Sequence, residues 1–184
     1  MDVILYILPL RFQDNALLVD LSSTLSEVFK LPVSILQRTL PLDEGYDPVR
    51  NQFNSSWILS RLLKLTPEES CKIIGVTEVD LYVPVLTFVF GEAQVEGQVA
   101  VVSSYRLRDE LYGLPKNPER LKERLEKEAI HELGHTFGLI HCRDPECVMH
   151  SYTYAEEIDF KSKNFCTSCA ALLKSKKNKF NDMI

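Results

Sequence analysis

Apolar residues near the amino terminus follow two different periods. The run from Val3 to Leu8 is rich in long and β-branched apolar residues and stops at Pro9, which predicts a buried strand. Residues 14–30 then place apolar side chains at intervals of three and four, so this segment is expected to form a helix whose apolar stripe packs on a sheet. A second strand is predicted near residues 33–40.

The next stretch mixes turn residues with further helical patterns. Residues 42–51 contain proline, glycine and several charges and are predicted to form a surface loop, whereas residues 55–65 resume helical spacing. Thr66 can cap a helix, Pro67 has no N–H to satisfy at the first helical position, and Glu69 completes a capping box. A short helix is therefore expected to begin there.

From residue 79 to residue 105 the pattern changes to that of strands. The apolar runs Val83–Phe90 and Val99–Val102 flank a turn-prone stretch over 91–97, so a hairpin is expected. An Asn-Pro pair at 117–118 then marks the start of a helix whose first half carries charged residues on its outer face. This order of elements predicts an α+β or mixed α/β fold.

Composition and charge narrow the class of protein. With 184 residues, 45% of them apolar, the chain fits one domain with a sizeable core. Its 26 acidic and 21 basic residues give a net charge of −5, which offers no attraction to nucleic acid or to an anionic membrane. No basic leader with a cleavage site is visible, and no apolar run reaches the roughly 18 residues that cross a bilayer, so a cytoplasmic protein is expected. A lysine-rich stretch near the carboxyl terminus is interpreted as a solvated helix end and comprises Lys174, Lys176, Lys177 and Lys179.

Three histidines have the spacing of metal ligands. His131 and His135 are four residues apart in the predicted helix, so their imidazoles lie on one face and can converge on a single ion. Gly138 can take the left-handed conformation that ends a helix, which allows His141 to return to the same ion. Three nitrogen ligands suit zinc, and a fourth position left to water is typical of a catalytic site.

Glu132 is the predicted general base. It follows His131 directly and can reach a water on the metal without being a ligand. Zinc lowers the pKa of such a water to roughly 7, which makes amide hydrolysis the best-matched reaction. A bare H-E-x-x-H can arise by chance in a charged helix, but the added Gly138 and His141 make that explanation weak.

Four of the five cysteines form a second candidate metal site. They follow the pattern C-x4-C-x18-C-x2-C and are Cys142, Cys147, Cys166 and Cys169. Four thiolates fill every zinc position, so such an ion would stabilise the fold without doing chemistry. Iron in a rubredoxin-like site and free thiols are alternatives, whereas the acidic charge disfavours a nucleic-acid-binding zinc ribbon. Cys71 lies apart, in a helix-like apolar context, and is interpreted as an inert buried thiol.

The two sets together resemble a known family. The pattern H-E-x-x-H-x-x-G-x-x-H from His131 to His141, followed by Met149, resembles the signature of the metzincin clan of zinc peptidases. Its direct continuation into C-x4-C-x-M and a later C-x2-C pair is similar to the archaemetzincins, and the segments 88–93 and 103–107 also resemble that family. The stretch between Met149 and Cys166 is one residue shorter than the family spacing, at a place where a deletion is tolerable.

The resemblance implies an architecture as well as an activity. It implies a zincin-like metzincin fold within one domain over 1–184, in which a mixed twisted sheet and the active-site helix form an upper subdomain over 1–138. A smaller lower subdomain over 139–184 would hold the second zinc ion. Met149 would form an apolar floor beneath the catalytic zinc without binding it. Two zinc ions per chain are therefore expected, one catalytic and one structural.

The leading hypothesis is a monomeric zinc peptidase that cleaves peptides or small proteins. Its substrate would lie in extended form along an exposed strand edge, for which residues 97–105 are the candidate. The alternative is a non-catalytic or latent zinc-binding protein with an occluded site that acts through interactions. Tyr152 and Tyr154 are interpreted as surface or packing residues, and His150 receives no role because the three-histidine set is complete.

Overall fold

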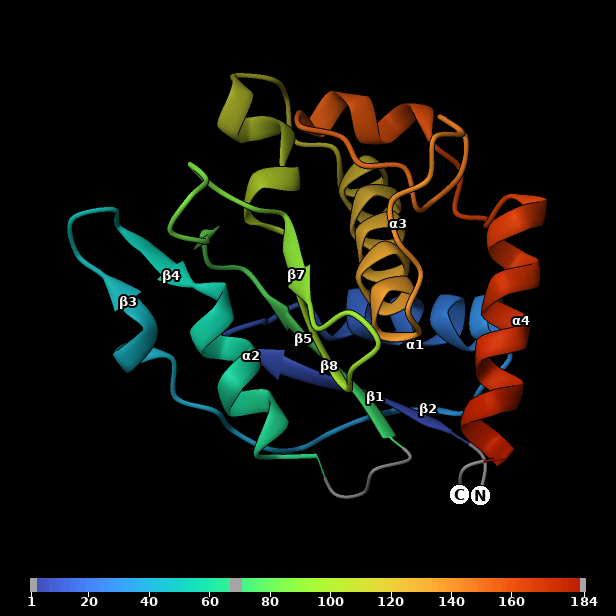
Figure 1. The fold of residues 1–184 in the computed structure, drawn as a ribbon. Coiled ribbons are helices and arrows are strands. Elements are labelled where there is room, and N and C mark those ends of the chain that lie inside the picture. Colours follow the sequence, from blue (N-terminus) through green and yellow to red (C-terminus); the bar gives the residue numbers. More distant parts are fainter. Residues whose placement is uncertain (1–2, 67–70, 183–184) are drawn as a thin grey trace.

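A computed structural model describes residues 3–66 and 71–182 of the chain and centres on a five-stranded sheet (Figure 1). The strand order is β2-β1-β5-β8-β7; the first four strands run parallel, and β7 pairs antiparallel with β8. The bounds are β1 Ile4–Leu10, β2 Val33–Ile35, β5 Cys71–Thr77, β7 Gly91–Ala93 and β8 Val99–Ser103. A small second sheet has the order β3-β4-β6, with β3 Tyr46–Asp47, β4 Gln52–Asn54 and β6 Leu81–Tyr82.

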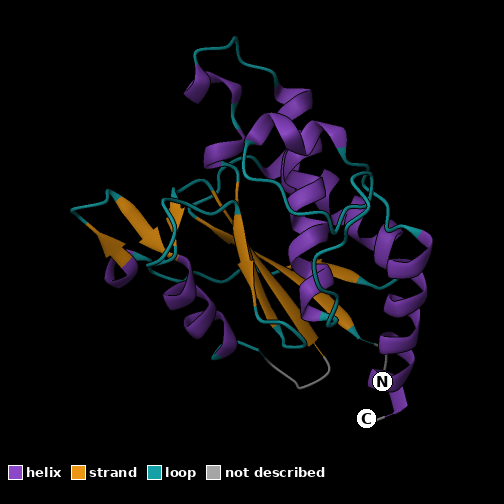
Figure 2. Ribbon diagram, turned by 45° about the horizontal axis from the view of Figure 1, so that its top comes forward, coloured by secondary structure: helices purple, strands orange, loops and turns teal. Residues whose placement is uncertain are grey.

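Helices cover both faces of the main sheet (Figure 2). The helices are α1 Asn15–Phe29, α2 Ser55–Leu63, α3 Pro118–Thr136 and α4 Thr167–Asp182. In β8, Ala100 and Val102 join the core under α1 and α3, whereas Val99 and Val101 join the core under α2. Because successive strand residues point to opposite faces and both faces are covered, β8 is buried throughout.

Local signals set the ends of the two long helices that were predicted. The Asp14 side chain accepts a hydrogen bond of 3.0 Å from the backbone N–H of Leu17, and α1 ends at Lys30 in the left-handed conformation. Asn117 accepts a bond of 3.0 Å from the N–H of Arg120 at the start of α3. The predicted helices over 14–30 and from residue 118 are therefore confirmed, as is the helix expected over 55–65.

Two strand predictions were wrong in extent. The second strand stops at Ile35 instead of continuing to residue 40. The run Val83–Phe90 is mostly irregular, and the hairpin partner of β8 is the short β7 instead. The carbonyls of residues 84, 86 and 87 accept hydrogen bonds from the side chains of Arg50 and Gln52, so side chains replace a strand partner along this segment.

The sequence interpretation missed the central strand β5. Its residues are all buried between β1 and β8, and Cys71, assigned to a helix-like context, begins this strand. A short apolar run fits a buried strand and a buried helix equally well, which explains the error. Cys71 is a buried thiol as expected. The helix start expected at Thr66 to Glu69 falls largely on 67–70, outside the described residues.

The carboxyl-terminal helix α4 is tied to the rest of the domain by two of its lysines. Nζ of Lys176 lies 2.5 Å from Oε1 of Glu96, and Nζ of Lys177 donates to the carbonyl of Phe29 at 2.5 Å. The lysine-rich stretch is thus partly a packing surface. Across 3–66 and 71–182, no helix combines the length and the apolar character needed to cross a membrane.

A buried arginine connects α3 to the segments before and after it. Arg124 is 2% exposed and donates 2.7 Å bonds to both carboxylate oxygens of Asp159. It also donates 2.9 Å bonds to Asp109 and to the carbonyl of Leu107. Because all three nitrogens of its guanidinium donate to acceptors, this buried charge is compensated.

The variant Arg124→Met should lower the free energy of unfolding by roughly 3 kcal/mol, because Asp159 would lose both of its hydrogen bonds from Arg124 and buried Asp109 would keep only its bond from Arg120. Lys122→Met is the matched control on the same helix: Lys122 pairs with exposed Asp20, and its loss should change stability little. Urea unfolding of the three proteins measures the difference. Equal midpoints for Arg124→Met and Lys122→Met would contradict the assignment.

Candidate functional site

Three histidines converge at the end of α3. His131 and His135 lie on one face of the helix, and Gly138 follows it with φ +84°, a left-handed conformation that reverses the chain. His141 is thereby returned to the helix, and one ring nitrogen from each of the three histidines lies within 4.8 Å of the others. The structure brings together the three residues that the sequence singled out.

Main-chain carbonyls orient the two histidines of α3. Nδ1 of His131 lies 2.9 Å from the carbonyl oxygen of Val148, and Nδ1 of His135 lies 2.8 Å from that of Leu139. A carbonyl oxygen only accepts, so each Nδ1 carries the hydrogen and each Nε2 presents a lone pair. The two Nε2 atoms are 3.1 Å apart and would repel without a shared cation. Nitrogens about 2.0–2.1 Å from a tetrahedral zinc lie about 3.3 Å apart, so the donor set fits zinc.

Glu132 lies deep in the site beside the sheet. A Cβ at position 91 would stand 2.7 Å from Cγ of Glu132 and 2.6 Å from the carbonyl oxygen of Val101. Only glycine therefore permits this close approach of α3 to β7. The carboxylate reaches the cleft next to the histidines without belonging to the group of three ligand nitrogens.

Burial governs the titration of these groups. It lowers the pKa of His131 well below its ordinary value, and nearby Lys161 lowers that pKa further, so the ring is neutral and able to donate a lone pair. Burial raises the pKa of Glu132 well above its ordinary value; Glu128 adds to the rise and Lys161 opposes it. A divalent cation among the histidines would favour the carboxylate form.

Met149 packs directly beneath the helix that carries the histidines. It is fully buried, and a Cβ at position 134 would collide with its Sδ and lie 3.2 Å from its Cε. Gly134 thus makes room for the thioether. The position agrees with the apolar floor that the resemblance implied.

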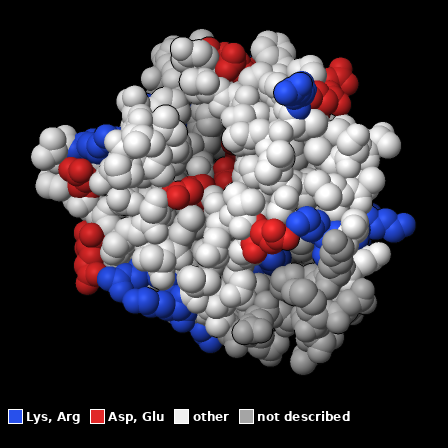
Figure 3. Space-filling view, in the orientation of Figure 1, with Lys and Arg blue, Asp and Glu red and all other residues white. Residues whose placement is uncertain are grey.

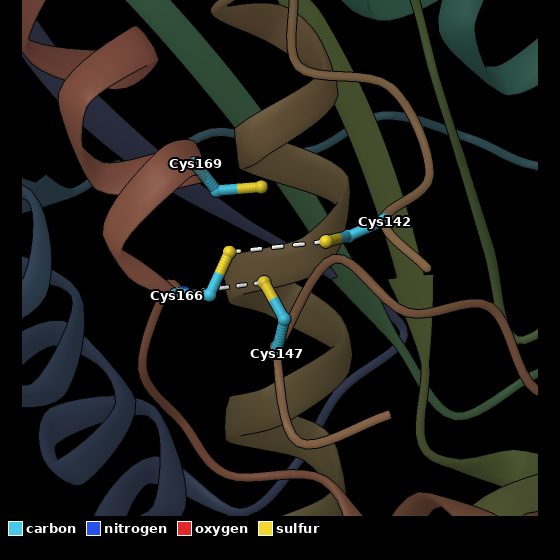
Figure 4. A group of neighbouring side chains, drawn as sticks. All are labelled: Cys142, Cys147, Cys166 and Cys169. Carbon is cyan, nitrogen blue, oxygen red and sulfur yellow. Dashed lines mark hydrogen bonds between the residues drawn. The ribbon is translucent and has the colours of Figure 1, made fainter. Parts of the chain in front are cut away.

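The four cysteines form a second cluster, shown in Figure 4. Cys142 and Cys147 come from the segment after His141, Cys166 precedes α4, and Cys169 lies in its first turn. One sulfur from each lies within 4.8 Å of the other three, and the Sγ atoms of Cys142 and Cys166 are 3.8 Å apart. That separation excludes a disulfide, and sulfurs about 2.3 Å from a tetrahedral zinc are about 3.8 Å apart. The donor set fits a closed zinc site.

A cleft of about 520 Å³ opens onto the three histidines and Glu132. Residues 86–93 line one side, and residues 150–153 with Lys161 line the other. Figure 3 shows a hollow near the centre of this face, with acidic side chains at its floor and edge. His150 and Tyr152 line the cleft, whereas Tyr154 is 61% exposed and does not.

The strand edge at the cleft is β7, and the prediction of residues 97–105 for this role was wrong. Those residues contain β8, which is buried between β5 and β7 and has no open edge. β7 pairs on one side only among the described strands, and all three of its residues line the cleft. Glu92 is held there by Ser55 Oγ at 2.5 Å and Ser56 Oγ at 2.8 Å, at the positive amino-terminal end of α2.

Three charged residues of the cleft were not found from the sequence: Glu92, Glu128 and Lys161. Glu128 carried a usable signal, because it lies four residues before Glu132 and so shares its helical face. Lys161 carried none, since only the fold brings it to the cleft.

Comparison with known proteins decides the family. A model described as Peptidase family M54 matches residues 11–175. The chain belongs to peptidase family M54. It is 40% identical over 168 residues to the archaemetzincin of Methanocaldococcus jannaschii, an alignment that covers 91% of each protein.

Solved structures of related peptidases agree with the M54 assignment. The zinc-dependent peptidase of Methanocorpusculum labreanum matches with a TM-score of 0.84 and 35% identity, over 92% of this chain and 99% of that one. The archaemetzincin of Methanopyrus kandleri matches with a TM-score of 0.82 and 35% identity, over 96% of each. The predicted archaemetzincin family and its zincin-like mixed α/β fold are confirmed. The M54 protein described here is a zinc metallopeptidase.

The close packing of Met149 against Gly134 predicts that alanine at position 134 lowers stability, the opposite of its usual effect in a helix. Alanine normally stabilises a helix interior by about 1 kcal/mol relative to glycine. Gly134→Ala should instead destabilise the protein, because the new methyl group collides with Met149. In thermal unfolding, Gly134→Ala/Met149→Ala should lose less than the sum of the single variants. Strict additivity would show that the two residues are not coupled.

Proposed function

We propose that His131, His135 and His141 hold the catalytic zinc ion, and that a second, structural zinc ion is held by Cys142, Cys147, Cys166 and Cys169. The facing Nε2 lone pairs support the first site, and the 3.8 Å sulfur separation supports the second. The histidine site is open to the cleft, whereas four thiolates leave no position for substrate or water.

Glu132 is the general base of this proposal. Zinc in the histidine site would polarise a peptide carbonyl and lower the pKa of a water molecule. The Glu132 carboxylate takes a proton from the attacking water and delivers it to the leaving amine. The observation that carries this assignment is the placement of a buried carboxylate in the cleft, beside the histidines but outside their ligand set. Gly91 keeps it there by admitting the helix close to β7.

Peptide substrates lie along β7 in this proposal. The free edge of β7 can pair with an extended main chain, and the cleft beneath it receives the side chains. The same cleft counts against the alternative of an occluded, non-catalytic site, because the histidines and Glu132 line it together. A single peptidase domain over 1–184 with subdomains 1–138 and 139–184 is part of the proposal; a cytoplasmic location and a monomeric state stay predictions.

Purified protein should contain two zinc ions per chain, measured by elemental analysis. A mild chelator should remove the histidine-bound ion first, because its open position admits a competing ligand. His135→Ala should lose that ion and keep the other.

Cys166→Ser should lose the structural ion and unfold at a lower temperature, because that ion contributes folding free energy. A single ion in the parent, or two ions lost in His135→Ala, would contradict the two-site assignment.

Glu132→Gln should retain both zinc ions and lose turnover by about 10²- to 10⁴-fold, because the amide cannot accept the proton of the water. The measurement compares zinc content and cleavage of an unbiased peptide library by parent and variant. Glu123→Gln, an exposed position on the same helix, is the matched control and should cleave at the parent rate. Parental turnover in Glu132→Gln would refute the general-base role. Absence of cleavage by the parent itself would favour the non-catalytic alternative.

A further inference from the structure

An ion pair lies in the catalytic cleft beyond the residues of the mechanism. Nζ of Lys161 is 2.8 Å from Oε1 of Glu128 and donates to the carbonyl of His150 at 3.1 Å. The two side chains are 1% and 8% exposed, yet both line the cleft that contains His131 and Glu132. Lys161 is the one lysine or arginine among the described residues that line it.

The pair is not needed to join its two segments. Lys163 and Glu126, the same residue types two positions away on each segment, already connect them at 2.8 Å. That second pair lies outside the cleft lining. Because desolvating charges is costly, a second ion pair placed inside the cleft calls for a role in the cleft.

The hydrogen-bonding capacity of the pair is incomplete. A lysine ammonium has three N–H donors; one is directed to the His150 carbonyl, and the ammonium forms an ion pair with Oε1 of Glu128 at 2.8 Å. The second carboxylate oxygen of Glu128 accepts no hydrogen bond from the described residues, and Glu128 lines the cleft. One donor and one acceptor therefore stand side by side. A carboxamide presents the complementary acceptor and donor. A substrate carboxylate would be repelled by the carboxylate of Glu128, and a substrate ammonium would be repelled by the ammonium of Lys161.

The direction of α3 shows on which side of the scissile peptide bond the Lys161–Glu128 pair would lie. Glu128 lies one helical turn before Glu132, about 6 Å along the axis. Gly91 packs on Glu132, and the N–H of Glu96 donates to the carbonyl of His135, so α3 and β7 advance in the same direction. A peptide antiparallel to β7, as β8 is on the other side, then has its carboxyl-terminal part on the Glu128 side.

We propose that Lys161 and Glu128 form the base of a specificity pocket that selects a carboxamide side chain, glutamine or asparagine, in the residue that follows the scissile bond. This inference rests on the proposed function, because the pocket is defined relative to the histidine zinc site and Glu132. Each of the two residues contributes one hydrogen bond to the substrate amide. Charge-assisted hydrogen bonds of this kind are worth about 10- to 100-fold in affinity.

Short peptide hydroxamates test the pocket without requiring turnover. The hydroxamate chelates the zinc in the histidine site, and the probes differ only in the first side chain after it: glutamine, glutamate, lysine or methionine. The parent protein with both zinc ions should bind the glutamine probe about 10- to 100-fold more tightly than the methionine probe, measured by calorimetry. The glutamate and lysine probes should bind more weakly than the glutamine probe.

Two variants should shift this ranking in opposite directions. Lys161→Met leaves the Glu128 carboxylate alone and should favour the lysine probe, whereas Glu128→Gln leaves the Lys161 ammonium alone and should favour the glutamate probe. Lys163→Met and Glu126→Gln are the matched controls and should keep the parent ranking, because that pair lies outside the cleft. A purely structural role would weaken all probes alike.

The outcomes separate the pocket from the proposed function. If the methionine probe binds the parent most tightly, the pocket assignment is wrong and the zinc site stands. The same conclusion follows if the order of affinities is identical in the parent and in all variants. If no hydroxamate binds the zinc-loaded parent, the catalytic site and the pocket that depends on it both fall. The parent ranking decides the question even where a cleft variant does not fold.

Discussion

The close approach of α3 to β7 is the constraint on which the site depends. One face of this helix fills the core with Leu125, Ala129 and Leu133, and the adjacent face presents the polar groups of the cleft. Gly91 removes the one side chain that would separate Glu132 from the strand edge. The proposed substrate edge, the proposed base and two of the three candidate zinc ligands, His131 and His135, are thereby fixed by one helix–strand contact, where a small shift would misplace them together.

The two metal sites share the short segment over 141–150. The Val148 carbonyl orients His131, while the N–H of Cys142 donates to the Met149 carbonyl and the ring of His150 contacts the Cys142 carbonyl. A structural ion held by Cys142 and its partners would immobilise the segment that orients His131 and carries His141. The proposed structural zinc would therefore support the histidine site by holding these contacts in position, as outer contacts of a metal ligand commonly do.

Two buried groups of charged side chains in the domain are compensated by partners. All three nitrogens of the Arg124 guanidinium donate to acceptors, and Lys161 and Glu128 are paired with each other. The Arg124 network and the Lys161–Glu128 pair differ in how many of their hydrogen-bonding groups have partners. The Arg124 network is closed and connects α3 to its neighbours, whereas the Lys161 pair retains a donor and an acceptor beside the cleft. A closed network stabilises, and an incomplete one at a binding site is able to discriminate between ligands.

The sequence by itself determined the zinc-peptidase family, because the candidate histidine and cysteine ligands and Glu132 lie close together along the chain and α3 has local start and stop signals. Asn117, the four-residue histidine spacing and Gly138 each act within a few residues, and such patterns are readable without a fold. Tertiary structure alone decided which strand edge borders the cleft and which residues line its base. β7 has only three residues, too few to show a periodic pattern, and the apolar run of β5 is compatible with a helix or a strand. Lys161 and Glu128 are 33 positions apart in the sequence and come into contact only through the packing of their two segments. Contacts between residues so far apart in the sequence depend on the whole fold, so no local sequence pattern predicts them.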